Sequence, residues 1–381
     1  MIFRILEDQH ADKARLAKAV DRRFMQLALT LGRRGLGRTA PNPAVGAVIV
    51  KDGVIVGRGW TQDGGRPHAE PEALRRAGAQ AKGATLYVTL EPCSHVGRSP
   101  PCADAVIAAG IARVVSAMPD PNPDVAGQGH ARLRAAGIVV DVGLLGDEAA
   151  RDHAGHISRV VNKRPHVILK LAVSSDDKIG LAGKPVAITG EETRSRVHLL
   201  RAQCDAILVG IGTVIADNPD LTCRLPGMAA QSPVRVVLDR ALRISGDSKL
   251  VHSARNAPLW LVASETAEAA AATKLGAAGA VIIRLPTRDA PGLDLVSIMA
   301  ALHARNITRL MVEGGARVAK SFLQANLVDE VWLLRGPDAI GDSGVAALHD
   351  LPLSTITQSP DFARRASETL GRDTLTIYER A

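Results

Sequence analysis

The sequence predicts an α/β protein with two domains. Its 381 residues are enough to form two separate hydrophobic cores. Hydrophobic residues make up 46% of the chain, which is typical of an ordinary globular α/β protein. Apolar runs with strand character alternate with helical stretches in both halves, and this order predicts mainly parallel sheets.

The first predicted domain covers residues 21–146. Residues 45–50 and 54–57 read as two strands joined by the tight turn Lys51-Asp52-Gly53. Further along, the sequence predicts a helix over 69–77, a strand over 84–91, a helix over 102–110 and a buried strand over 112–117. Two prolines precede the helix at 102–110 and a glycine ends it. A strand, a loop and a helix N-terminus therefore surround the loop at 92–101, where catalytic groups collect in open α/β sheets.

The second predicted domain covers residues 165–381. Its expected strands are 166–173, 206–209, 234–238, 259–262, 281–283, 309–312 and 330–334. The alanine-rich stretch 265–280 reads as a surface helix. Residues 209–219 read as a strand followed by a loop with two glycines and an acid, and residues 312–316 as a strand that turns into a helix. Glycines there would let the backbone approach a phosphate. A tight turn would explain either segment alone, but together they favour a dinucleotide-binding sheet of a non-Rossmann type.

Composition narrows the classes of function. The formal charge is +8, which would suit a nucleic-acid partner. However, only 2% of the residues are aromatic, and proteins that bind or edit single strands stack bases on aromatic side chains. The first 20 residues show no signal peptide, and no apolar run is long enough to span a membrane. Four cysteines in a chain of this length favour a reducing cytosol.

One group of residues is typical of a metal-binding site. His68 and Glu70 flank Ala69, and Cys93 and Cys102 follow about two dozen residues later. One imidazole and two thiolates supply three zinc ligands and leave the fourth position to a water that the metal makes acidic. Glu70 could then carry the proton of that water to a leaving amine. This is the arrangement of the zinc deaminases, except that eight residues rather than two separate the cysteines.

Other interpretations remain open for the same residues. A structural zinc site would recruit a fourth ligand, and His95 is near enough in sequence to be considered. The histidine could also be a surface residue and the thiols could be free core cysteines. The catalytic interpretation is favoured because Cys102 falls in the first turn of a helix, where the macrodipole stabilises a thiolate.

Beyond this group, the chain resembles the family of bifunctional deaminase–reductases of riboflavin biosynthesis. The matching motifs in the first half are residues 40–46, 67–70, 89–102, 120–123 and 125–129, and in the second half 200–201, 212–214, 217–219, 221–224 and 313–315. The resemblance implies a cytidine-deaminase-like three-layer α/β/α domain followed by a dihydrofolate-reductase-like α/β domain. It also implies Zn²⁺ and NADPH as cofactors.

The resemblance assigns roles to residues of the first half. His68, Cys93 and Cys102 would bind zinc, and Glu70 would move protons while an activated water displaces ammonia from a pyrimidinone. The implied substrate is 2,5-diamino-6-ribosylamino-4(3H)-pyrimidinone 5′-phosphate. The implied substrate contacts are Asn42, His95 and Arg98, with Arg98 suited by charge to the phosphate.

For the second half, the resemblance implies that NADPH delivers a hydride to C1 of the ribosyl group and opens it to a ribityl chain. Substrate-binding positions would be Arg201, Leu221, Arg224 and Glu313. Cofactor-binding positions would be Val173, Ala187, Thr213, Asp217, Gly315, Ala316, Arg317, Val318, Ala319, Lys320 and Ser321. For the two arginines a surface salt bridge is the simpler explanation, but two arginines that flank one loop favour phosphate binding.

Partners and location follow from the same resemblance. We expect a small phosphorylated pyrimidine as substrate, no nucleic acid, no membrane, a cytoplasmic location and a homo-oligomer, namely a dimer through the reductase domain. The alternative is a nucleic-acid or nucleoside deaminase with a non-catalytic C-terminal binding domain. That alternative would explain the zinc motif and the basic charge, but not the second half.

Three positions depart from the pattern of the family. Thr61 stands where many relatives have histidine, and Asp177 stands where the family has a glycine near the expected nicotinamide. Residues 185–189 lack the family's serine and tryptophan, which Pro185 and Ala187 replace. From the changes in the second half we predict that the reductase binds NADPH more loosely than its relatives do.

Overall fold

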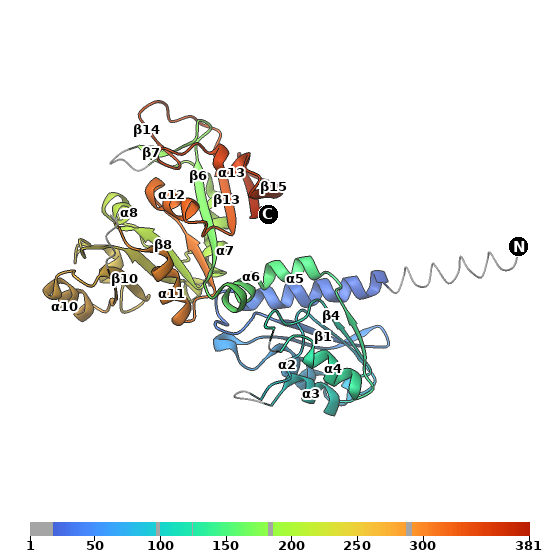
Figure 1. The fold of residues 1–381 in the computed structure, drawn as a ribbon. Helices are drawn as coiled ribbons and strands as arrows, with labels where there is room; N and C mark the ends of the chain where they lie inside the picture. The colour runs from blue at the N-terminus through green and yellow to red at the C-terminus, as the bar shows by residue number, and fades with distance from the viewer. Residues whose placement is uncertain (1–17, 97–99, 124, 182–185, 287–291) are drawn as a thin grey trace, which may run out of the picture. The chain divides into compact units, whose positions relative to one another are not determined.

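The computed structural model describes residues 18–96, 100–123, 125–181, 186–286 and 292–381. The chain divides into two compact units, and the division falls between Asn162 and Lys163. Both units are built from helices packed on a sheet (Figure 1). The predicted class, a two-domain α/β protein, is therefore confirmed.

The first unit contains a five-stranded sheet in the order β2-β1-β3-β4-β5. Its strands are β1 (Gly46–Lys51), β2 (Val54–Trp60), β3 (Thr85–Val88), β4 (Arg113–Ser116) and β5 (Val139–Val142). The pairs β1–β2 and β1–β3 are antiparallel, whereas β3, β4 and β5 run parallel. The carboxyl ends of β3 and β4 therefore meet at one edge of the sheet, next to the loop that carries Cys93.

Helices cover both faces of this sheet and make the predicted three layers. The helices of this unit include residues 18–32, α2 (Ala69–Ala77), α3 (Cys102–Ala108), α4 (Gln128–Ala135), α5 (Gly146–Asp152) and α6 (Ala154–Ile157). Shorter helical turns are η1 (Arg33–Gly35), η2 (Asp63–Gly65), η3 (Gly78–Ala81) and the π-helical η4 (Ser158–Asn162). Apolar side chains of α2, α3 and α4 pack on one face of the sheet, and those of helix 18–32 and α5 pack on the other (Figure 1).

Two glycines of β2 bring α2 unusually close to the sheet. A Cβ atom on Gly59 would lie 2.1 Å from the carbonyl oxygen of Ala69, and one on Gly57 would lie 2.3 Å from that of Ala73. Alanines on the facing side of α2 complete this close contact. Because α2 also carries Glu70, the missing side chains help to fix the position of that carboxyl group.

The second unit contains a nine-stranded sheet in the order β11-β10-β9-β8-β12-β6-β13-β16-β15. Its strands are β6 (His166–Val173), β8 (Ala206–Gly210), β9 (Val234–Leu238), β10 (Leu259–Ser264), β11 (Val281–Leu285), β12 (Arg309–Val312), β13 (Glu330–Arg335), β15 (Phe362–Leu370) and β16 (Asp373–Arg380). The strands from β11 to β13 are parallel, and β16 and β15 continue the sheet antiparallel. A separate antiparallel pair joins β7 (Lys178–Leu181) to β14 (Gly344–Ala346).

Both faces of this sheet are also covered. The helices are α7 (Glu191–Ala202), α8 (Ile211–Asp217), α9 (Lys249–His252), α10 (Ala269–Ala277), α11 (Leu295–Ala304), α12 (Ala316–Gln324) and α13 (Ser354–Thr357), with a 3₁₀ turn η5 (Ala229–Gln231). Side chains of α11, α12 and α13 form one core with residues of β6 and β8, and side chains of α7 to α10 form the other. Successive side chains of each strand point to opposite faces of the sheet, so the apolar strands contribute to both cores.

Several parts of the structure differ from the prediction, which also lacked strand β5. Residues 211–217, expected as a loop, form α8 directly after β8. The sequence analysis did not anticipate the β15–β16 hairpin, because most side chains of β15 are polar and exposed and show no buried alternation. The short pair β7–β14 was also missed, since it joins segments far apart in the chain.

Candidate metal centre and ligand cleft

The structure brings His68, Cys93 and Cys102 together in the first unit. His68 precedes the first residue of α2, Cys93 lies in the loop after β3, and Cys102 is the first residue of α3. The Nδ1 atom of His68 lies 3.3 Å from Sγ of Cys102 and 3.8 Å from Sγ of Cys93. All three donor atoms lie within 4.8 Å of one another.

This geometry fits a tetrahedral zinc ion. Bonds of about 2.0–2.3 Å to zinc place a nitrogen and a sulfur ligand about 3.6 Å apart. Hydrogen bonds to Cys102 and His68 lower the pKa of the Cys93 thiol to about 4, although burial opposes this, and the thiolate is the form that binds metal. His95 does not belong to the cluster among the described residues, so the described donors leave one coordination position open.

Glu70 lies beside the three donors, in the first turn of α2. Its side chain is buried, with only 3% of the residue exposed. Burial raises the pKa of Glu70 to about 7, because a charged carboxylate is disfavoured away from water. A carboxyl group with such a pKa can both accept and donate a proton near neutral pH, which is what a proton shuttle requires.

A second buried carboxylate, Glu91, holds the loops around the cluster. Its Oε1 accepts hydrogen bonds from the backbone N–H groups of Gly129 and His130, at 2.7 and 3.1 Å. Its Oε2 accepts from those of Asp120 and Gly127, at 3.0 and 2.9 Å. Since Glu91 lies two residues before the Cys93 ligand, it ties the segment 120–130 to the loop that carries this thiol.

Replacing Glu91 with glutamine should destabilise the first unit. The amide would point an N–H group at backbone N–H groups that now donate to the carboxylate. Because these donors would lose their acceptor, we expect the free energy of unfolding to fall by about 2–4 kcal/mol. Scanning calorimetry of the full chain would measure this as a lower transition temperature. Glu148→Gln, which changes a partly exposed partner of Arg22, is the control. Equal transition temperatures for the two variants would contradict the anchoring role.

The predicted substrate contacts of the first half do not form a cluster like that of the three metal donors. Asn42 is half-buried and donates from Nδ2 to the carbonyl oxygen of Gly65, at 3.2 Å. His95 is exposed, and lines a small recess together with Cys93 and Asp120. Arg98 lies outside the described residues. Thr61, the departure from the family pattern, is buried and accepts a hydrogen bond from the N–H of Val45 at 3.0 Å, so its hydroxyl serves the fold.

In the second unit, a cleft of about 830 Å³ opens at the carboxyl ends of the parallel strands. Segments that end β6, β8, β9 and β12 line it, together with the first turn of α12. Of the predicted residues, the lining contains Arg201, Leu221, Glu313, Thr213, Asp217, Gly315, Ala316, Arg317 and Val318. The carboxyl edge of a parallel sheet is the usual place for a ligand.

A charged network lies in the cleft around Glu313. Its Oε1 accepts a hydrogen bond from Lys170 Nζ at 2.9 Å, and its Oε2 accepts from Arg201 Nη2 at 2.8 Å and Nε at 3.1 Å. Burial alone would raise the pKa of Glu313, but the two cations outweigh it and lower the pKa to about 2. Glu313 therefore stays ionised and fixes both cations at the cleft.

Lys170 was missed by the sequence analysis, although a signal was present. It is the only charged residue after the first position of the apolar strand β6, whose sequence is HVILKLAV. A lysine inside a buried strand needs a partner, and Glu313 supplies it. Ile188 and His349 also line the cleft without having been predicted as site residues.

Six predicted residues lie outside the lining of this cleft: Val173, Ala187, Arg224, Ala319, Lys320 and Ser321. Val173 and Ala319 belong to the hydrophobic core, and Ala187 is exposed. Lys320 forms an ion pair with Asp350 at 2.6 Å, and Arg224 is exposed, 3.8 Å from Asp220. Ser321 lines a neighbouring pocket.

Asp177 and Pro185 are the remaining positions that depart from the family pattern. Asp177, at the position of a family glycine, adopts φ of 63°, in the left-handed region that glycine occupies freely. It forms an ion pair with Arg335 at 2.7 Å, which offers compensation for the backbone conformation. Pro185 lies outside the described residues.

Two family models match the chain. The cytidine and deoxycytidylate deaminase zinc-binding region matches residues 18–118, and the RibD C-terminal domain matches residues 165–376. Fold and sites thus define the class: a zinc-dependent deaminase joined to an NADPH-dependent reductase. The alternative of a deaminase with a non-catalytic second domain is not supported, because the second half matches a reductase domain of its own.

Relatives match over almost the whole chain. The riboflavin biosynthesis protein RibD of Aquifex aeolicus is 40% identical over 96% of this chain and 100% of its own. That of Escherichia coli is 41% identical over 93% of this chain and 97% of its own. The structure of Acinetobacter baumannii RibD matches 96% of this chain and 99% of its own, with a TM-score of 0.83 and 36% identity.

The chain belongs to the RibD family of riboflavin biosynthesis proteins. It is a bifunctional enzyme that combines a zinc-dependent deaminase and an NADPH-dependent reductase. Zn²⁺ and NADPH are its cofactors. Within the described residues, none of the helices is both long and apolar enough to cross a bilayer.

Proposed function

We propose that the enzyme first deaminates 2,5-diamino-6-ribosylamino-4(3H)-pyrimidinone 5′-phosphate and then reduces the ribosyl group of the product. The observation that carries the first step is the approach of three donor atoms to within 4.8 Å beside the buried carboxyl of Glu70. A solved Thermotoga maritima protein, 35% identical over 96% of this chain, is described as a diaminohydroxyphosphoribosylaminopyrimidine deaminase and 5-amino-6-(5-phosphoribosylamino)uracil reductase.

In the deamination, His68, Cys93 and Cys102 would hold Zn²⁺, which when bound would supply a water molecule acidic enough to attack the pyrimidinone. Glu70 takes the proton of that water and returns it to the departing amino group. Water and the amino-bearing carbon thus give a carbonyl group and ammonia. Asn42 and His95 contact the pyrimidine, and Arg98 contacts the 5′-phosphate. The predicted domain 21–146 contains all of these residues.

In the reduction, the predicted domain 165–381 supplies the cleft around Glu313. Arg201, Arg224, Leu221 and Glu313 bind the substrate, with Glu313 accepting from the ribose hydroxyls and the arginines serving the phosphate. When bound in this cleft, NADPH would supply the hydride that C1 of the ribosyl group accepts. The ring oxygen leaves C1 and receives a proton, so the sugar opens to a ribityl chain.

Helix α8, which follows β8, and the start of α12 would hold the cofactor. Thr213, Asp217 and residues 315–318 line the cleft at this place. Val173, Ala187 and residues 319–321 remain predicted contacts. Gly314 supports the close approach of these segments, because a Cβ there would lie 3.0 Å from Oγ1 of Thr213 and its φ is 147°. The N-terminal end of α12 lies at the cleft, where the helix dipole favours a phosphate.

Deuterium transfer tests this assignment. We expect deuterium from stereospecifically labelled NADPH to appear at C1 of the ribityl product, as seen by mass spectrometry and NMR. Unlabelled product formed with complete consumption of the labelled NADPH would refute C1 as the hydride acceptor. The control is the substrate that still carries its amino group, supplied to zinc-free protein, and no deuterium should be transferred to it.

Removal of the metal should separate the two activities. Treatment with a chelator is expected to abolish ammonia release, whereas the reduction of already deaminated substrate continues, because the cluster of metal donors among the described residues lies in the first unit. Adding Zn²⁺ should restore ammonia release. A chelator saturated with zinc beforehand serves as the control. Loss of both activities on chelation would contradict the assignment of zinc to the first unit alone.

For the assembly, we infer a homodimer through the reductase domain. Strand β15 forms the end of the nine-stranded sheet, and most of its side chains are exposed. Such an edge can pair with its copy about a two-fold axis. Light scattering on the full chain would show the mass of a dimer. We also propose a cytoplasmic location, consistent with four free cysteines, and no role for nucleic acid.

A further inference from the structure

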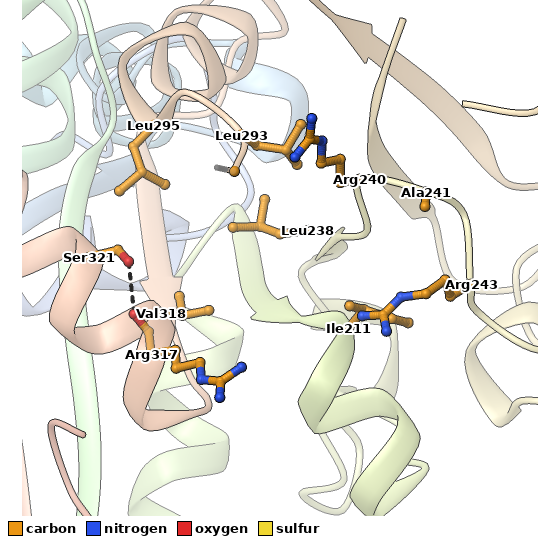
Figure 2. Close-up of a pocket in the computed structure, with 11 residues that line it drawn as sticks. Ile211, Leu238, Arg240, Ala241, Arg243, Leu293, Leu295, Arg317, Val318 and Ser321 are labelled. Atoms are coloured by element: carbon orange, nitrogen blue, oxygen red, sulfur yellow. Dashed lines mark hydrogen bonds between the residues drawn. The ribbon is translucent and has the colours of Figure 1, made fainter. Parts of the chain in front are cut away.

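A second pocket lies beside the cleft in the reductase unit, with a volume of about 450 Å³. Arg240 and Arg243, just past the end of β9, and Arg317, in the first turn of α12, line it (Figure 2). Leu238, Leu293 and Leu295 contribute apolar walls. None of the eleven lining residues is acidic.

This pocket continues the cleft. Ile211, Leu238, Arg243, Arg317 and Val318 line both of them. A ligand that reaches from the network around Glu313 past the first turn of α12 would therefore enter the second pocket. The pocket is thus suited to the far end of an extended molecule.

The three guanidinium groups have no protein partner among the described residues. Figure 2 shows them at the pocket, and the one hydrogen bond between lining residues joins the hydroxyl of Ser321 to the carbonyl oxygen of Arg317. In the adjoining cleft, by contrast, Arg201 is paired with Glu313. Three cations around one pocket, with no acid among its described lining residues, attract a multiply charged anion such as a phosphate monoester.

We propose that this pocket binds the 2′-phosphorylated adenosine of NADPH and that Arg240 and Arg243 select NADPH over NADH. The apolar walls suit the adenine ring, and guanidinium groups bind phosphate oxygens with two donors and can stack on the base. NADH has a hydroxyl in place of the 2′-phosphate and gains none of these charged contacts. The inference rests on the proposed reductase function, which places the nicotinamide in the adjoining cleft.

The test compares two adenosine fragments by titration calorimetry on the full-length, zinc-loaded protein. Adenosine 2′,5′-bisphosphate carries the 2′-phosphate, and adenosine 5′-monophosphate does not. We expect Arg240→Ala and Arg243→Ala each to raise the Kd of the bisphosphate by about 10- to 100-fold, which is the contribution of one charged hydrogen-bonding group. The Kd of the monophosphate should change far less. Arg305→Ala removes an exposed arginine whose guanidinium bonds only to the carbonyl oxygen of Ala301, and is the control for net charge.

Kinetics give the second measurement. In the double variant the preference for NADPH over NADH, as a ratio of kcat/KM values, should fall by 100-fold or more, on the order of two charged contacts. Ammonia release from the same preparations reports intact folding, and Arg240→Lys with Arg243→Lys should retain part of the preference. An unchanged preference for NADPH over NADH in the double variant would overturn the proposal. An equal loss of affinity for both adenosine fragments would overturn it as well.

The failure of this inference can be told apart from failure of the proposed function. A wild-type protein that binds the bisphosphate more tightly than the monophosphate, but never oxidises NADPH, would refute the reductase function and keep the pocket assignment. A wild-type protein that oxidises NADPH, but binds the two fragments equally, would keep the function and overturn the pocket assignment.

Discussion

Glu70→Gln is expected to abolish ammonia release, with kcat falling by about 10²- to 10⁴-fold, the contribution of a positioned proton-transfer group. The amide has the same shape but cannot carry the proton from water to the leaving amine. Zinc content should remain one ion per chain, because Glu70 is not one of the three donors. Reduction of already deaminated substrate should be unchanged. Ammonia assays and atomic absorption measure the two quantities.

Glu72→Gln is the matched control for that experiment. Glu72 lies on the same turn of α2 and pairs with Arg75 at 2.9 Å, away from the three donor atoms. The same chemical change there should leave ammonia release within about twofold, since exposed ion pairs contribute little. Glu70→Gln with normal ammonia release, in protein that holds zinc, would contradict the assigned proton transfer.

Glu313→Gln is expected to have the largest effect on the second activity. Without its charge, Lys170 and Arg201 lose the carboxylate that positions them, and the substrate loses an ionised acceptor. We expect kcat/KM for the reduction to fall by about 10²- to 10³-fold, the effect of two charged hydrogen bonds. Ammonia release from the first unit should not change. The free energy of unfolding should fall by about 1–3 kcal/mol, because two partly buried cations lose their partner.

Glu330→Gln separates these two effects. Glu330 is a buried carboxylate on β13 whose pKa is also lowered to about 2, against the effect of burial, chiefly by His166, and it does not line the cleft. Its replacement should lower stability by a similar amount while the folded protein keeps its reductase activity. If both variants lose reductase activity equally, Glu313 acts only through stability and the assigned role is wrong.

The sequence was most informative where function depends on local spacing. His68 and Glu70 are neighbours on one turn, and Cys93 and Cys102 flank one loop, so the cluster could be predicted without a structure. The parallel strands of the second unit were also predicted, because their apolar runs are short and separated by helices. The helix α8 was missed because its glycine and short length resemble a loop.

The charged network of the cleft could not be worked out from local pattern. Arg201 and Glu313 are 112 residues apart and meet only because β8, β12 and β6 are neighbours in the sheet. Their roles were predicted through the resemblance, which said nothing of Lys170. The free arginines around the second pocket form a group only once β9 and α12 are placed, so their joint charge is a product of the fold.

The most direct test of the account is one assay on purified, zinc-loaded protein. Substrate is added alone, ammonia is followed to completion, and NADPH is then supplied while its absorbance is recorded. We expect one ammonia per substrate before NADPH is present, followed by one NADPH oxidised per ammonia released. Oxidation of NADPH without prior release of ammonia would contradict the proposed order, and absence of both signals would contradict the assigned reactions.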